Sequence, residues 1–259
     1  MAGQPRDVWN PDQYRKFQGE RAAPFHDLLA MVEPSAAPRV LDLGCGTGEL
    51  TRLAHERLGA RETLGVDASP AMLERAAAQA GGGVSFEQGD LASFARGEHD
   101  VVLSNAAIHW VPDHEALLPR LLRLVAAGGQ LAVQAPANDH HPSHAIARAV
   151  ASEPEFAGPL GGWVRTSPLL EPEAYAALLF RHGFSRQRVR WEIYAHPLAS
   201  RDDVVEWVRG TTLTDYQRRL DAPGFERFLA RYRERLRAAL PDERPFLYTY
   251  RRLFLWARR

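Results

Sequence analysis

The sequence predicts an α/β protein with a doubly wound sheet of seven strands, mostly parallel, with one antiparallel strand near the edge and a helical cap. Two observations lead to this fold class. Short apolar runs alternate with amphipathic segments of helical spacing from residue 39 to about 135. Two further strand-like segments, residues 186–195 and 246–257, come later in the chain. We therefore expect five βα units followed by two late strands, which form an antiparallel hairpin at one end of the sheet.

The early strands are short and largely apolar, as is typical of a parallel sheet that is covered on both faces. They are expected at residues 39–43, 63–67, 84–88, 100–104 and 130–134. Helical spacing between them is found at residues 48–58, from Pro70 to about 80, and from His114 to about 126. Ser69 precedes the second helix as an N-cap, with Pro70 at its first position. Glycines at 81–83 and 128–129 are expected to end the second and third helices.

The remaining segments are expected to complete a single domain over residues 1–259. Further helical patterns occur at residues 142–152, 172–182, 202–209 and 224–239. Residues 197–240 are too long for a hairpin loop between the late strands, so we expect a helical cap insertion there. Cap helices are also expected in residues 1–35, which contain no strand. The core sheet with its flanking helices is then assigned to residues 36–196 and 241–259.

The composition excludes several classes of protein. Lysine plus arginine and aspartate plus glutamate each total 32, which argues against a protein that coats nucleic acid. The single cysteine, Cys45, allows no disulfide within the chain. The sequence has no apolar run of membrane-spanning length and no signal-peptide pattern. We therefore expect a cytoplasmic protein, monomeric or weakly dimeric, with no nucleic-acid or membrane partner.

The first predicted strand ends in the loop Asp42-Leu43-Gly44-Cys45-Gly46-Thr47-Gly48, where a doubly wound sheet binds its ligand. A dinucleotide fingerprint requires a third glycine or alanine at position 49, but Glu49 stands there, which disfavours a nicotinamide oxidoreductase. A phosphate-binding P-loop is excluded because the only lysine is Lys16. Asp42 suits a cationic ligand, and Asp67, at the end of the second strand, can accept ribose hydroxyls. A ribose and a cation without a pyrophosphate describe S-adenosylmethionine (SAM).

These motifs, together with Gly65-Val66-Asp67-Ala68-Ser69-Pro70 and Gln88-Gly89-Asp90-Leu91, resemble class I SAM-dependent methyltransferases. The resemblance covers residues 39–135 and implies a Rossmann-like fold, with S-adenosyl-L-homocysteine (SAH) as the product. It places Asp42, Gly44 and Gly46 at the methionine end and Asp67 at the ribose. The residues implied at the adenine are Ala68, Met72, Asp90 and Leu91. Asn105 and Ala106 are implied beside the sulfonium and sugar, and Tyr14 and Arg21 complete the expected cofactor site.

A narrower resemblance, to trans-aconitate 2-methyltransferases, extends over nearly the whole chain. It rests on Trp9-Asn10-Pro11, on residues 105–114 and 131–136, and on Glu206-Trp207-Val208-Arg209-Gly210-Thr211. It implies methylation of one carboxylate of a small polycarboxylic acid. The expected substrate-binding residues are Arg21, Trp110, Trp163, Arg165, Tyr194, His196, Trp207 and Arg252, with Arg251 as a further candidate. The chain departs from the family at Thr214-Asp215, where the family usually has an arginine followed by proline.

The chemistry of the acceptor decides whether a base is needed. A carboxylate acceptor needs none, because the enzyme mainly aligns it with the methyl group and clamps its other anionic groups with arginine. A hydroxyl, amine or carbon acceptor needs a base, and His109 is the candidate. No metal is expected, although His140 and His144 have ligand spacing. A natural-product O-, N- or C-methyltransferase and a non-catalytic SAM-binding protein are the alternatives.

Overall fold

The computed structural model describes the backbone of residues 18–259 and the side chains from Ala23 onwards. These residues divide into two compact units. A sheet unit contains residues 22–137, 168–192 and 251–259, and a helical unit contains residues 138–167 and 193–250. The prediction of one domain over residues 1–259, with its cap boundaries, stays a prediction.

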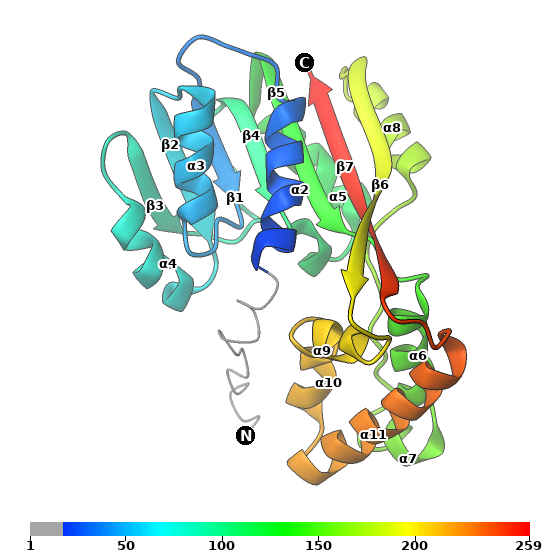
Figure 1. Cartoon of the computed structure of the whole chain (residues 1–259). Helices are drawn as coiled ribbons and strands as arrows, with labels where there is room; N and C mark the ends of the chain where they lie inside the picture. Colours follow the sequence, from blue (N-terminus) through cyan, green and yellow to red (C-terminus); the bar gives the residue numbers. More distant parts are fainter. Residues whose placement is uncertain (1–17) are drawn as a thin grey trace. The chain divides into compact units, whose positions relative to one another are not determined.

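The seven-stranded sheet has the order β3-β2-β1-β4-β5-β7-β6 (Figure 1). The strands are β1 (Arg39–Leu43), β2 (Glu62–Asp67), β3 (Val84–Gln88), β4 (His99–Asn105), β5 (Val125–Pro136), β6 (Arg186–Leu198) and β7 (Phe246–Arg258). Strands β1 to β5 pair in parallel, and β7 pairs antiparallel with β5. This confirms the predicted fold class, and it brings the ends of β1, β2 and β4 to one edge of the sheet.

The helices of the sheet unit lie on both faces of the sheet, with α2 and α3 on one and α5 on the other (Figure 1). Their bounds are α2 (Gln18–Met31), α3 (Glu49–Leu58), α4 (Pro70–Ala76), η1 (Ala77–Gln79), η2 (Ile108–Trp110), α5 (His114–Arg123) and α8 (Pro172–Arg181). The Ser69 side chain caps α4 by accepting the backbone N–H of Met72, as its position in the sequence predicted. The N-terminal helical pattern expected before residue 18 lies outside the described residues.

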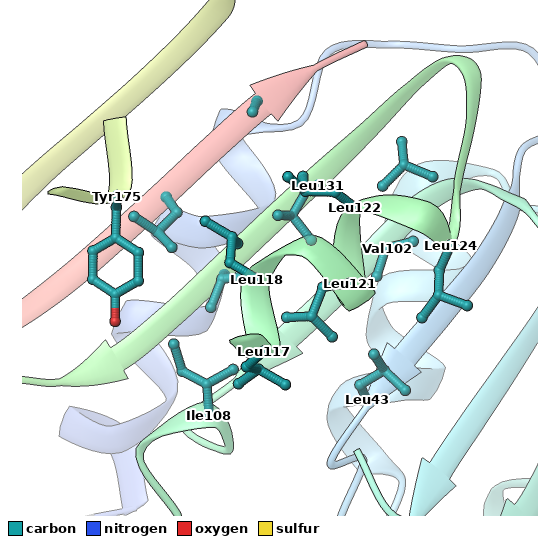
Figure 2. Packing of buried hydrophobic residues seen from close by; sticks show 14 of the residues in the cluster. Leu43, Val102, Ile108, Leu117, Leu118, Leu121, Leu122, Leu124, Leu131 and Tyr175 are labelled. Atoms are coloured by element: carbon teal, nitrogen blue, oxygen red, sulfur yellow. The ribbon is translucent and has the colours of Figure 1, made fainter. Parts of the chain in front are cut away.

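One core cluster joins α5 and α8 to the sheet (Figure 2). Leucines at 117, 118, 121 and 122 of α5 are buried against Val102 of β4 and Leu131 of β5. They recur at the spacing of one helix face, which is why α5 packs flat on the sheet. Behind them, Tyr175 of α8 shares a hydrogen bond with His114, and the His114 Nε2–H donates to the Ile108 carbonyl at 2.9 Å. This network fixes η2, which directly follows the carboxyl end of β4.

The helical unit contains α6 (Pro142–Ala151), α7 (Pro154–Ala157), α9 (Asp203–Arg209), α10 (Thr214–Arg219) and α11 (Ala222–Ala239). Its core consists of aromatic and branched side chains, among them Phe156, Tyr216, Phe228 and Tyr232. Among the described residues, no helix combines the length and the apolar character that crossing a membrane requires.

One local expectation is wrong, and two short helices were not predicted. Gly128 and Gly129 do not precede the fifth strand but lie inside β5, which begins at Val125. The sheet accommodates them because the pairing register of β4 and β5 shifts between His99 and Val101. The short helices α7 and α10 were not predicted, because four and six residues are too few to show a helical period.

Candidate active site

The glycine loop after β1 is tightly packed at one glycine and open at another. The backbone N–H groups of Gly44 and Cys45 both donate to the Val66 carbonyl, at 2.8 and 3.1 Å. Gly44 has φ +81°, and a Cβ there would overlap the Cβ of Ala107. Gly46 has φ +56°, but a Cβ there would meet no atom within 4 Å. The backbone at Gly46 is therefore accessible to a ligand, while Gly44 holds the loop against the segment that follows β4.

Asp67 ends β2 and organises the same loop. Its Oδ2 accepts the N–H of Gly46 at 2.9 Å, and its Oδ1 accepts the N–H of Ser69 at 2.9 Å. Each carboxylate oxygen has a second lone pair, and the side chain is only half-buried. Asp67 can therefore accept two further hydrogen bonds from the paired hydroxyls of a ribose.

Asp42 is a buried carboxylate on β1, only 3% exposed. Its Oδ2 accepts the hydroxyl of Thr51 at 2.5 Å, whereas its Oδ1 has no partner among the described residues. Burial raises the pKa of Asp42 to about 6; the Thr51 hydrogen bond opposes this increase, and the charge of Asp67 adds to it. A buried carboxylate with a free oxygen is costly unless a cation or a donor joins it. Asp42 therefore suits the positively charged ligand that the sequence predicted.

The expected adenine side of the site has both polar and apolar groups. The Oδ1 of Asp90 accepts the N–H of Ala92 at 2.8 Å, and the residue is exposed. Leu91 is buried, Met72 is half-buried and Ala68 is exposed. Their contact with an adenine stays a prediction, and the exposed carboxylate of Asp90 has lone pairs left for an amine.

The carboxyl end of β4 contributes strained backbone and an amide. Ala106 has φ +51°, in the left-handed region, and its N–H donates to the carbonyl of Gln134 at 2.8 Å. The Oδ1 of Asn105 is buried without a partner in the part of the chain that the structure describes. Strain and unsatisfied polarity occurring together are typical of a ligand site. The rings of His109 and Trp110 lie 4.6 Å apart, and Trp110 is 58% exposed.

These observations test whether a SAM molecule fits. The partnerless Oδ1 of Asp42 can accept a hydrogen bond from a cationic group. The open backbone at Gly46 allows the ligand to approach the loop closely. The remaining lone pairs of Asp67 can accept the hydroxyls of a ribose. The residues present therefore fit the cofactor.

Burial, followed by the charges of Asp42 and Asp67, raises the pKa of the Cys45 thiol. The thiol stays protonated, so it is no nucleophile.

The sheet unit also holds two of the arginines expected at the substrate. Arg252 is buried on β7, with 7% exposure. Its backbone is paired with Pro136 of β5, two residues beyond Gln134. The guanidinium of Arg251 lies 5.4 Å from the centre of the Trp191 ring. Arg252 is thus beside the end of β5 and Arg251 stacks on an indole, which makes Arg252 the better candidate for holding an anion.

The other expected substrate residues lie in the helical unit. The Arg165 Nε–H donates to Asp215 Oδ2 at 3.1 Å, and its Nη1 lies 4.0 Å from Asp139. The rings of Trp163 and Tyr216 lie 5.4 Å apart. The rings of Tyr194, His196 and Trp207 form a continuous stack, with 4.5 Å between His196 and Trp207. Asp215, which marks the departure from the family pattern, therefore already partners one of the proposed clamps.

Some predicted residues cannot be located. Tyr14 lies outside the described residues, and Arg21 is described only as part of helix α2.

No group of three or more potential metal ligands occurs among the residues that the structure describes.

Two polar residues near this site were not predicted from the sequence. Thr51 of α3 bonds to Asp42, and the Gln134 side chain lies fully buried near the end of β5. For Gln134 a signal was available, because a glutamine stands within an otherwise apolar strand. For Thr51 none was, since its contact with Asp42 depends on how α3 packs.

Comparison with known proteins agrees with this geometry. Residues 40–129 match the family model described as a methyltransferase domain. The trans-aconitate 2-methyltransferase of Deinococcus radiodurans is 42% identical, over 97% of this chain and 98% of the relative. That of Methylobacterium nodulans is 43% identical, also over 97% of this chain and 98% of the relative.

Solved structures show the same fold at lower identity. The YcgJ protein of Bacillus subtilis has a TM-score of 0.61 at 18% identity, covering 92% of this chain and 98% of that one. A SAM-dependent methyltransferase of Mesorhizobium loti has a TM-score of 0.53 at 23% identity, covering 94% of this chain and all of the other. With full-length relatives above 40% identity, the chain belongs to the trans-aconitate 2-methyltransferase family of SAM-dependent methyltransferases.

Proposed function

We propose that this enzyme esterifies one carboxylate of a small polycarboxylic acid, such as trans-aconitate. The observation that carries the proposal is the identity of about 40% to trans-aconitate 2-methyltransferases over the full length of both chains. When bound, SAM supplies an electrophilic methyl group; the carboxylate oxygen bonds to its carbon while the carbon–sulfur bond breaks and its electron pair goes to sulfur. A carboxylate is already ionised at neutral pH, so no residue has to remove a proton.

The residues of the chain then bind and orient the two substrates. Asp42 lies beside the cationic methionine end and Asp67 accepts the ribose hydroxyls. Asp90 and Leu91 contact the adenine, with Ala68 and Met72 beside it; a part for Tyr14 and Arg21 in cofactor binding stays a prediction. Arg252 holds a carboxylate that does not react, with Trp110 beside it. In the helical unit, the remaining substrate contacts are Trp163, Arg165, Tyr194, His196 and Trp207. Cytoplasmic location, a monomeric or weakly dimeric state and independence from metal stay predictions.

The test is methyl transfer from labelled SAM to a panel of aconitate, citrate, isopropylmalate and fatty acids. We expect label in a product of the tricarboxylic acid and its release by mild base, as for an ester. Label that resists base would instead indicate an O-, N- or C-methyltransferase acting on another nucleophile, with His109 as the base to examine. Binding of SAH without transfer to any acid would contradict the proposal and favour a cofactor-binding protein.

A matched pair of aspartates tests the cofactor site separately. Asp67→Ala should weaken SAH binding by about 1–3 kcal/mol, because a ribose hydroxyl loses a charged acceptor. Asp100 stands at the opposite end of the parallel strands, where its Oδ2 accepts the Arg39 N–H at 2.8 Å. Asp100→Ala is therefore the control and should leave the SAH dissociation constant, measured by calorimetry, unchanged. Equal effects of the two substitutions would overturn the assignment of Asp67.

A further inference from the structure

Gln134 is a buried side chain whose polar atoms are left unused. It is 0% exposed at the carboxyl end of β5. Neither Oε1 nor Nε2 has a hydrogen-bond partner among the described residues. Only its backbone is engaged, with the carbonyl accepting the Ala106 N–H at 2.8 Å. Burying an amide without partners is unfavourable, and an apolar residue would pack here at less cost, so a ligand is the natural partner for these atoms.

The strand register places Gln134 in a row of polar side chains. Asn105 of β4 is paired with Gln134, and Pro136, two residues further along β5, is paired with Arg252 of β7. Because paired residues and every second residue along a strand share a face, Asn105, Gln134 and Arg252 lie on one face, near the carboxyl ends of β4 and β5 and midway along β7. The Oδ1 of Asn105 also lacks a partner within the described part of the chain. Two unsatisfied amides therefore lie beside a buried arginine.

The order of the strands indicates which ligand reaches Gln134. The glycine loop follows β1, the next strand is β4, and β5 comes after it. Asn105 is thus beside the cofactor loop, and Gln134 is one strand further away, toward Arg252. This position fits the acceptor of the methyl group better than the cofactor itself.

The charge change during transfer favours an amide at the reacting group. A carboxylate loses its negative charge as it becomes an ester. An arginine bound directly to it would stabilise the ionised ground state more than the transition state, and would slow the reaction. A neutral N–H donor orients the same oxygen with a smaller penalty of this kind. An arginine is instead suited to a second carboxylate, which keeps its charge throughout.

Building on the proposed function, we propose that the Gln134 Nε2–H donates to the reacting carboxylate of the acceptor and orients it for methyl transfer. Arg252, on the same face, holds a carboxylate that does not react. Gln134 is therefore a substrate-orienting residue, one that the sequence analysis did not assign.

Gln134→Met and Gln134→Glu test this role in the full-length protein. Gln134→Met removes the amide at similar volume and should lower kcat/KM for trans-aconitate at least tenfold. Calorimetry should show weaker binding of trans-aconitate to the SAH complex, with the dissociation constant of SAH within twofold of wild type. Gln134→Glu keeps the shape but places a carboxylate against the acceptor, so it should impair acceptor binding more than Gln134→Met. A merely structural role would leave kcat/KM and acceptor binding of Gln134→Met at wild-type values, because an apolar side chain of similar volume fills this buried position at no greater cost.

Gln130 provides the matched control. It lies on the same strand and the same face, but its Oε1 accepts the Trp256 Nε1–H at 2.9 Å and its Nε2–H donates to the Glu33 carbonyl at 2.9 Å. Gln130→Met should lower the melting temperature and leave acceptor binding unchanged. Gln134→Met should instead leave the melting temperature unchanged and weaken acceptor binding. Wild-type kinetics in Gln134→Met, or a loss of SAH affinity, would overturn the role of Gln134. A wild type that forms no base-labile product would contradict the proposed function, and this role with it.

Discussion

Buried polar side chains near the carboxyl ends of β1, β4 and β5 differ from a buried polar network of the helical unit. In the sheet unit, Asp42, Asn105 and Gln134 each have a buried atom with no partner among the described residues. In the helical unit, a chain of hydrogen bonds passes from Tyr248 through Ser143 and His144 to Thr212. Buried polar atoms without a hydrogen-bond partner are candidates for binding a ligand, whereas those with partners in the protein stabilise the fold. This difference separates the residues of the cofactor and acceptor site from those that hold the helices together.

His144 illustrates the satisfied kind. Its Nδ1 lies 3.0 Å from Ser143 Oγ, and its Nε2 lies 2.9 Å from Thr212 Oγ1. Burial, followed by the charge of Arg165, lowers its pKa to about 3, so the imidazole is neutral at physiological pH. In the unfolded chain the His144 imidazole is protonated below about pH 6.5, whereas in the folded protein it stays neutral. The full contribution of neutral His144 to the stability of the fold is therefore present above pH 6.5. The contribution is lost progressively as the pH falls toward 3.

The largest effect is expected at the packed glycine of the site. Gly44→Ala adds a Cβ that overlaps Ala107 at a φ of +81°, so the loop or the segment after β4 must move. We expect SAH binding to weaken about 100-fold, near 3 kcal/mol, in calorimetric titration. Gly59→Ala is the control, because it has a similar positive φ of +58° but no atom within 4 Å of the added Cβ. It should cost about 1 kcal/mol of stability and leave SAH affinity intact. Similar SAH affinities in the two variants would contradict this account of Gly44.

A smaller effect, on stability and not on the cofactor, is expected in the helical unit. Asp215→Ala removes the partner of Arg165, whose side chain is 17% exposed, and leaves a largely buried guanidinium with weaker compensation. The free energy of unfolding in urea should fall by about 2 kcal/mol. The double variant Arg165→Met, Asp215→Ala should recover part of this loss. SAH affinity should match wild type in both proteins, and a change there would break the distinction between the units.

Acceptor kinetics of the same variants sharpen the comparison. Arg165→Met should raise the KM for the acceptor, because Arg165 is proposed to contact the substrate although Asp215 pairs with it. An unchanged KM would show that Arg165 only stabilises the helical unit.

The sequence predicted the strands of the sheet unit and the position of the glycine loop well, because their signals are local. Gly44, Gly46 and Asp67 follow directly on apolar strands, and parallel strands bring their carboxyl ends together without further information. The pairing of Arg165 with Asp215 could not be predicted, since it joins residues fifty positions apart in a unit with no regular alternation. Gln134 could be noticed but not interpreted. Its meaning depends on the register with β4 and β7, which the sequence does not specify.

The smallest effect is expected at Asp42, whose buried carboxylate lowers the free energy of unfolding when it is ionised. Burial raises the pKa of Asp42 to about 6, so its carboxyl group binds a proton more tightly in the folded protein than in the unfolded chain. Stability therefore falls as the pH rises from about 4 to 6, and the full penalty applies above pH 6. Asp42→Asn removes the charge and still accepts the Thr51 hydroxyl. At pH 8 it should unfold at higher urea concentration, with a gain of about 1 kcal/mol that vanishes near pH 4.

The same substitution should weaken binding of the cofactor, because Asp42 is proposed to lie beside its amino-acid end, whose ammonium group is present in both SAM and SAH. We expect about a tenfold higher SAH dissociation constant at pH 8, equivalent to about 1.4 kcal/mol. The difference from wild type should shrink below pH 6, where Asp42 itself becomes protonated. A variant that is more stable and binds SAH more weakly would show that this carboxylate is kept for its ligand at the expense of the fold. A variant that is less stable, with unchanged SAH binding, would place Asp42 with the satisfied groups of the helical unit.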